Sequence, residues 1–101
     1  MPTSNGFGKD DPVAIRLREL REALGYTTAR AFAAYLEMSS QRWGNFETGS
    51  PLSREVAFLL VQKVPGLTLD WLYFGKADGL PVALAKRLGA IGEPRKATTR
   101  G

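Results

Sequence analysis

Residues 39–51, SSQRWGNFETGSP, are the most informative stretch of this sequence. Ser39 can cap the N-terminus of a short helix, and Gly49 can end it. Because successive helical residues are rotated by about 100°, Trp43 and Phe46 lie on one side of this helix. The opposite side carries neither a bulky side chain nor a charge. Its members are Ser40, Gln41, Gly44, Asn45 and Thr48.

The uncharged side of this helix has the chemistry needed to read base edges. Side chains of Gln and Asn can form paired hydrogen bonds with adenine in the major groove of DNA. Charged side chains mainly contact phosphates, which carry no sequence information of their own. The pattern therefore favours a helix over residues 39–48 that reads bases rather than one that holds the DNA backbone.

The composition limits the chain to one small domain without the usual catalytic groups. It has 101 residues, of which 44% are hydrophobic and 24% are charged, so most of the chain should fold around one core. The sequence contains no cysteine and no histidine, which excludes disulfides and removes the commonest acid–base group and metal ligand. We therefore expect no enzymatic activity, no metal and no cofactor.

The formal net charge of +4 lies at the C-terminal end of the chain. Residues 86–101 contain five basic side chains and one acidic side chain, and the residues before them sum to zero. A basic tail can attract nucleic acid or simply increase solubility, and the sequence leaves both open. Residues 56–61, the longest apolar run, are too few to span a membrane, and residues 1–11 lack the features of a signal peptide. We therefore expect a cytoplasmic protein.

Apolar residues at helical spacing predict an all-α chain. We divide it into a disordered N-terminal arm (1–9), a folded domain (10–75), a turn with a possible extra helix (76–91) and a flexible basic tail (92–101). The expected helices cover residues 12–24, 29–37, 39–48, 54–64 and 69–74, with a weaker sixth helix over 82–91. Their expected caps are Asp10 or Asp11, Thr27 or Thr28, Ser39, Ser53 and Thr68.

Residues 28–49, TARAFAAYLEMSSQRWGNFETG, resemble the helix-turn-helix of the lambda-repressor and Cro-type family, also called the xenobiotic response element family. The fourth and fifth expected helices fit the same five-helix domain, so the resemblance extends over residues 12–75. The matching positions are the small Ala33, the turn residue Met38, the cap Ser39, the core residues Trp43 and Phe46, and the closing Glu47-Thr48-Gly49.

The resemblance implies roles for individual residues in binding double-stranded DNA. It places Ser40, Gln41 and Asn45 where the family contacts bases and phosphates, and Arg42 on a flank suited to a phosphate. From the helix face and the charges we also expect Gly44 to lie toward the bases, and Thr48 and Arg30 to contact phosphates. The resemblance also implies that Arg21 pairs with Glu47, joining the first helix to the end of the third, and that Trp43 and Phe46 are core residues.

The sequence departs from the family pattern at three places. Ala29 replaces a glutamine that commonly bonds phosphate, and the segment between Gly25 and Ala33 is one residue longer than usual. Glu37 stands where the family has a turn glycine, which predicts either a left-handed backbone or a different turn.

The combined observations favour a sequence-specific transcriptional regulator of repressor or Cro type that acts as a homodimer on a two-fold operator. The alternative is a helix-turn-helix scaffold that serves as a protein-interaction or antitoxin-like module. A nucleoid-type binder that uses the basic tail is a third reading. We also expect Arg16, Arg18 and Arg30 to form a solvated face or to contact phosphate, and Trp71, Tyr73 and Phe74 to divide between the core and a subunit contact.

Overall fold

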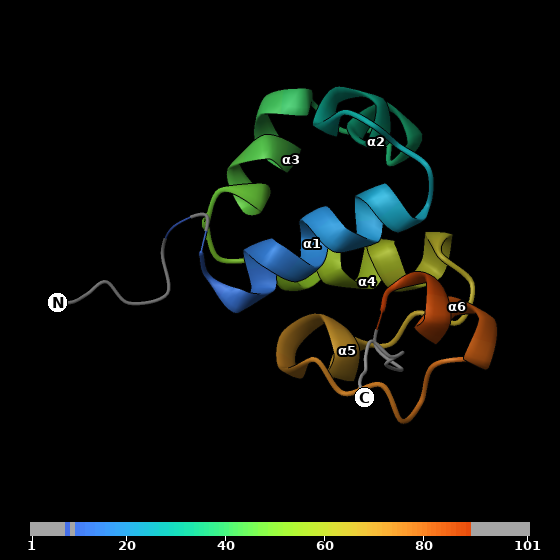
Figure 1. Ribbon diagram of the computed structural model, residues 1–101. Helices are drawn as coiled ribbons and strands as arrows, with labels where there is room; N and C mark the ends of the chain where they lie inside the picture. Colours follow the sequence, from blue (N-terminus) through green and yellow to red (C-terminus); the bar gives the residue numbers. More distant parts are fainter. Residues whose placement is uncertain (1–7, 9, 90–101) are drawn as a thin grey trace, which may run out of the picture.

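Six α-helices and no strand make up the part of the chain that the computed structural model describes, residues 8 and 10–89. The expected all-α class is therefore confirmed. In Figure 1, α2 and α3 lie on one side of α1, and α5 and α6 lie on the other. The helices are α1 (Pro12–Ala23), α2 (Ala29–Tyr35), α3 (Ser40–Glu47), α4 (Arg54–Lys63), α5 (Leu69–Phe74) and α6 (Val82–Arg87).

Each of the first five helices begins at a side chain that caps its N-terminus, as the sequence predicted. In α1, Oδ2 of Asp11 accepts hydrogen bonds from the backbone N–H groups of Val13 at 3.1 Å and Ala14 at 3.3 Å. A cap of this kind typically stabilises a helix by about 1 kcal/mol. The other caps are Thr28, Ser39, Ser53 and Thr68, each accepting from the backbone N–H three residues further on.

Most helices end within one residue of the expected position, but α2 and α6 end earlier, at Tyr35 and Arg87. α2 ends at Tyr35 because Glu37 adopts a φ of 61°, a left-handed conformation through which a helix cannot continue. α6 ends at Arg87, and Gly89, with a φ of 68°, follows its last turn. The remaining residues of the expected sixth helix, 90 and 91, lie outside the described part of the chain.

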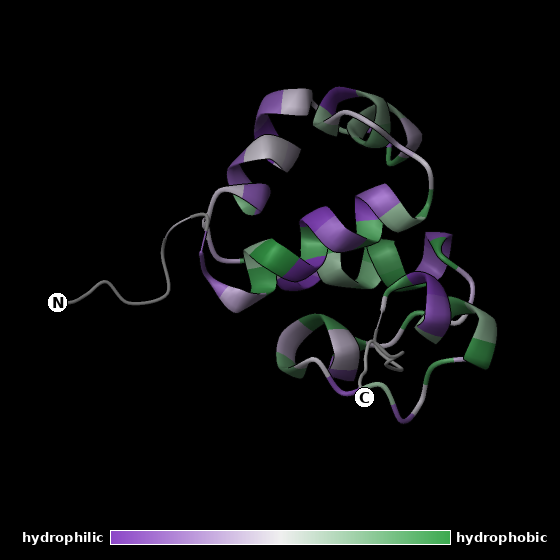
Figure 2. Cartoon of the chain, in the orientation of Figure 1, coloured by the Kyte–Doolittle hydropathy of each residue, from purple (hydrophilic) through white to green (hydrophobic). Residues whose placement is uncertain are grey.

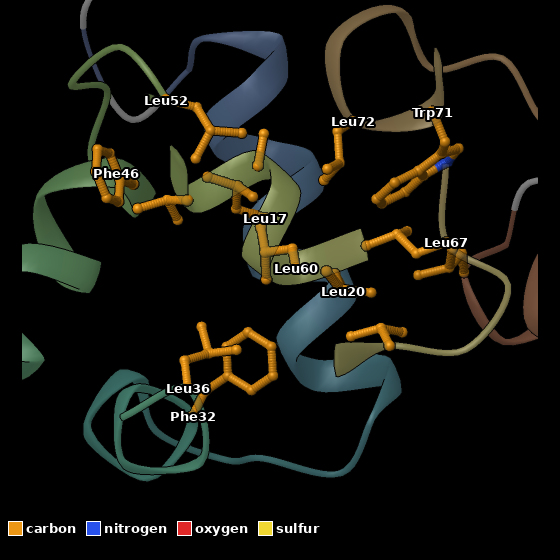
Figure 3. Close-up of a cluster of buried hydrophobic side chains, with 14 of the residues drawn as sticks. Leu17, Leu20, Phe32, Leu36, Phe46, Leu52, Leu60, Leu67, Trp71 and Leu72 are labelled. Carbon is orange, nitrogen blue, oxygen red and sulfur yellow. The ribbon is translucent and has the colours of Figure 1, made fainter. Parts of the chain in front are cut away.

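The hydrophobic core joins side chains from α1 to α5, several of which converge in Figure 3. Leu17 and Leu20 of α1 are fully buried, as are Phe32 of α2, Leu60 of α4 and Leu72 of α5. Full burial of one such side chain contributes about 1.5–3 kcal/mol relative to its exposure. α1 thus connects the pair α2–α3 to the C-terminal helices.

The segment after α5 contributes to the same core. Leu80, Leu84, Ala85 and Leu88 are all buried and belong to the cluster formed by the earlier helices. Arg87 donates a hydrogen bond from Nη2 to the carbonyl oxygen of Ala23, where α1 ends. The last helix is therefore packed on the unit that the sequence placed over residues 10–75. None of the described helices combines the length and the apolar character needed to cross a membrane.

Candidate nucleic-acid interface

α3 is held in place through its aromatic side. Trp43 is fully buried, and Phe46 is 8% exposed. The Trp43 ring meets Phe32 of α2 edge-on, with ring centroids 5.0 Å apart, and meets Phe46 in the same way at 6.4 Å. Aromatic pairs of this geometry contribute about 0.5–1.5 kcal/mol beyond the burial of their surface. The aromatic side of α3 is consequently packed in the core.

The carboxylate of Glu47 links the end of α3 to α1. Its Oε2 accepts a hydrogen bond from Nε of Arg21 at 2.8 Å and another from Nε1 of Trp43. Arg21 also donates from Nη1 to the carbonyl oxygen of Tyr26, at 2.9 Å, in the connection between α1 and α2. Arg21 and Glu47 are both buried, so removal of either would leave the other buried charge without its nearest partner. The pair that the resemblance implied is thus present, and it sets the position of α3.

Arg16 and Arg18 do not form the solvated face that the sequence suggested. Nε and Nη2 of Arg16 donate to the carbonyl oxygens of Leu72 and Tyr73, each at 3.0 Å, where α5 ends. Burial lowers the pKa of Arg16. Nη1 of Arg18 donates to the carbonyl oxygen of Glu47 at the end of α3. Because the last carbonyls of a helix lack helical partners and attract cations, both arginines stabilise helix ends.

The opposite side of α3 is open and polar. Figure 2 colours most of α3 from purple to white, in contrast to the green segments of the core. Ser40, Gln41 and Asn45 are exposed, and the amide groups of Gln41 and Asn45 make no hydrogen bond within the described residues. A Cβ added at Gly44 would meet no neighbouring segment within 4 Å. The structure therefore brings the predicted base-reading positions together on one accessible surface.

The three candidate phosphate ligands differ in their surroundings. Arg30 is exposed on α2 and has no ion pair with any residue in the described part. Thr48 directs its hydroxyl back to its own helix, with Oγ1 3.0 Å from the carbonyl oxygen of Gly44 and 3.1 Å from that of Asn45. Nη2 of Arg42 lies 3.3 Å from a carboxylate oxygen of Glu55 in α4. Of the three, Arg30 alone has its polar atoms facing solvent without an internal partner among these residues.

A link that the sequence did not predict joins α2 to α4. The Tyr35 hydroxyl donates to the carbonyl oxygen of Lys63 at 2.7 Å, and Nζ of Lys63 donates to the carbonyl oxygen of Tyr35 at 3.2 Å. Nζ of Lys63 also lies 3.9 Å from the carboxylate of Glu37. These contacts attach the turn between α2 and α3, including its left-handed residue, to the end of α4. Residues 28 positions apart in the sequence give no local signal of such a pair.

Two of the surface hollows formed by described residues are not lined by the polar side of α3. A cleft of about 260 Å³ separates the end of α2 and the start of α3 from α4. Arg42 and Glu55 both line this cleft, together with Phe58, which is 49% exposed. A second hollow of about 430 Å³ lies between the ends of α1 and α4 and the start of α6, and its lining is mostly apolar.

Neither metal chemistry nor similarity to a known protein assigns a function to this surface. Among the residues that the structure describes, no group of three or more acidic side chains could hold a metal ion. The chain matched no protein-family model, and searches of the curated proteins and of the solved structures found no match. The functional interpretation consequently rests on the geometry of α3 and its neighbours.

Proposed function

We propose that this protein binds double-stranded DNA sequence-specifically and acts as a transcriptional regulator of repressor or Cro type. In this proposal, α2, the turn after it and α3 form a helix-turn-helix within a five-helix domain similar to that of the lambda repressor. α3 enters the major groove, so that Ser40, Gln41 and Asn45 reach the base edges. Arg30 and the backbone N–H groups at the start of α2 and α3 contact phosphates.

The observation that supports this proposal most strongly is the contrast between the two sides of α3. Trp43, Phe46 and Glu47 hold one side in the core, so the helix cannot rotate to present a different face. The other side presents two unengaged amides with Gly44 between them. Amides supply the donor and acceptor pairs that base edges require, and the glycine lets the helix backbone approach the floor of the groove.

We further propose that the protein acts as a homodimer. One recognition helix covers only a few base pairs, and two copies related by two-fold symmetry double the number of bases read. Phe74 is 70% exposed at the end of α5, whereas Trp71 is 3% exposed. The hydroxyl of the half-buried Tyr73 donates to the carbonyl oxygen of Leu52 at 3.3 Å. Phe74 is therefore the member of this aromatic group that is available for a subunit contact.

A second candidate function is that of a protein-interaction module. It is favoured by the cleft beside α3, where Phe58 is 49% exposed and the exposed side chain of Arg42 is paired with Glu55. An exposed aromatic side chain at a cleft is a common feature of protein contacts. A partner that inserted an apolar side chain there would use the same scaffold without DNA.

Selection of bound sequences from a randomised pool of DNA duplexes tests the proposal directly. We expect enrichment of a common motif, with two inverted half-sites if the protein acts as a dimer. The logarithm of the affinity should fall linearly with the logarithm of the salt concentration. Binding without sequence preference would instead indicate a nucleoid-type binder that uses the basic tail. Absence of binding even at low salt would contradict the proposal and favour the interaction module.

A further inference from the structure

The segment proposed to bind DNA has little unpaired positive charge. Residues 28–49 contain two basic side chains, Arg30 and Arg42, and two acidic side chains, Glu37 and Glu47. Arg42 is the basic residue of α3, whose sequence is SQRWGNFE. The affinity of a protein for DNA of any sequence increases with the number of phosphates that its cations neutralise. With so few cations, the state of Arg42 has a large influence on this affinity.

In the structure, α4 engages Arg42. Nη2 of Arg42 lies 3.3 Å from Oε1 of Glu55, which belongs to the first turn of α4. The two side chains are 47% and 83% exposed, and both line the cleft between α3 and α4. An exposed ion pair is weak, and salt weakens it further. A guanidinium carries five N–H donors on a flexible side chain, so a phosphate can replace the carboxylate without a change in the backbone.

We propose that Glu55 competes with DNA phosphates for Arg42 and thereby lowers the affinity of the protein for DNA. This inference rests on the proposed DNA binding. In the free protein the carboxylate holds the guanidinium on the α4 side of α3. In the complex a phosphate takes the place of the carboxylate, so every binding event includes the loss of the Arg42–Glu55 pair. Glu55 acts through Arg42 and is therefore a positioning residue rather than a DNA contact.

The variant Glu55→Gln tests this inference because it removes the charge and keeps the shape of the side chain. Its affinity for the selected duplex should rise about two- to five-fold, the range expected when an exposed ion pair no longer has to be broken. The slope of log affinity against log salt should become only slightly steeper, because Arg42 contacts one phosphate in both complexes and the variant lacks only the salt-sensitive ion pair of the free protein. The melting temperature should change little, because the pair is exposed.

Glu37→Gln provides a matched control for the loss of one negative charge. The Glu37 side chain is also 83% exposed and lines the same cleft, but its carboxylate lies near Lys63 instead of Arg42. This variant should bind the selected duplex with nearly the affinity of the unmodified protein. A gain equal to that of Glu55→Gln would mean that any negative charge at this cleft repels DNA, which would overturn the inference.

Arg42→Gln separates competition from general repulsion. In this background the additional change Glu55→Gln should have no effect on affinity, because the group through which Glu55 acts is absent. An equal gain with and without Arg42 would overturn the inference, as would an unchanged or lower affinity of Glu55→Gln alone. Failure of the unmodified protein to bind any duplex would instead refute the proposed function, so the two failures are distinguishable.

Discussion

At the scale of single residues, Gly44 is the position that packing does not explain. Glycine within a helix is less favourable than alanine by about 0.5–1 kcal/mol. Many helical glycines are required because another segment lies against them, but no neighbouring segment comes within 4 Å of a Cβ at Gly44. The absent side chain therefore leaves space on the outside of the molecule. In the proposed complex, this space would allow close approach of the α3 backbone to DNA.

Substitution of Gly44 tests that explanation in two independent ways. Gly44→Ala should raise the melting temperature by a few degrees, since it removes about 0.5–1 kcal/mol of helix destabilisation in a small domain. Gly44→Leu is also compatible with a helix, but it should weaken binding to the selected duplex because its side chain occupies the groove. Unfolding curves and duplex titrations of both variants measure the two effects. Wild-type affinity in Gly44→Leu would show that this side of α3 does not enter the groove.

Gln41 is the residue that we expect to contribute most to base recognition. Gln41→Ala should reduce affinity for the selected duplex by about 1–3 kcal/mol and relax the preference at one base position. Its melting temperature should stay nearly unchanged because the amide makes no hydrogen bond within the described residues. Gln62→Ala, at an exposed glutamine of α4, is the control and should bind normally. Equal binding by both variants would exclude a base contact by Gln41.

At the scale of helices, contacts on the aromatic side of the eight-residue helix α3 determine the position of its polar side. Trp43 contacts Phe32 of α2, and its indole donates to Glu47, which in turn binds Arg21 of α1. Two neighbouring helices thus orient the polar side through contacts on the aromatic side. Loss of these contacts should affect DNA binding only by unfolding or displacing α3.

Trp43→Ala should therefore act on stability first. We expect a cost of about 3–5 kcal/mol, because the substitution leaves a cavity in the core. A small domain has a total stability of about 5–15 kcal/mol, so a large fraction would be lost. Chemical denaturation gives the free energy of unfolding of the variant. If the variant kept its stability and lost only DNA binding, Trp43 would be a surface residue that stacks on bases.

The sixth helix provides a second test at this scale. Leu84 is 7% exposed and packs in the core, whereas Val82 of the same helix is 62% exposed. Leu84→Ala should lower the free energy of unfolding by about 2–5 kcal/mol, and Val82→Ala should change it by less than about 0.5 kcal/mol. Denaturant titration of the two variants makes the comparison. Equal, small effects would mean that α6 is not part of the cooperative unit.

At the scale of the whole molecule, the net charge is concentrated at the C-terminal end of the chain. Residues 86–101 carry the whole net charge of +4, whereas the described core ends at Leu88. The helical domain alone is therefore nearly neutral, which is unusual for a protein that binds a polyanion. Sequence preference and general attraction to DNA should consequently be separable by removal of the tail.

Removal of residues 93–101 should show this separation. The deletion takes away three positive charges and one negative charge from residues that lie outside the described part of the chain. Nonspecific affinity should fall, and the salt slope should decrease by up to about 0.9 for each basic residue that contacts phosphate. The selected motif and the cooperative unfolding transition should remain. A loss of cooperative unfolding would show that these residues contribute to the core.

The sequence by itself determined the helices and the two sides of α3. Capping and helical periodicity act over three or four residues, so the five N-terminal caps and the burial of Trp43 followed from local spacing. The ends of α2 and α6 were less predictable. The left-handed backbone at Glu37 was one of two alternatives that the sequence left open.

The tertiary structure alone decided the partners of Arg16, Arg18 and Arg42. Arg16 and Leu72 are 56 positions apart, and only the packing of α1 against α5 brings the guanidinium to the end of that helix. The same holds for Arg42, whose partner Glu55 comes from another helix, and for Arg18 at the end of α3. Long side chains take the nearest unpaired carbonyl or carboxylate in space. Which acceptor is nearest depends on how the helices pack. The local sequence does not determine the distance between a side chain and an acceptor on another helix.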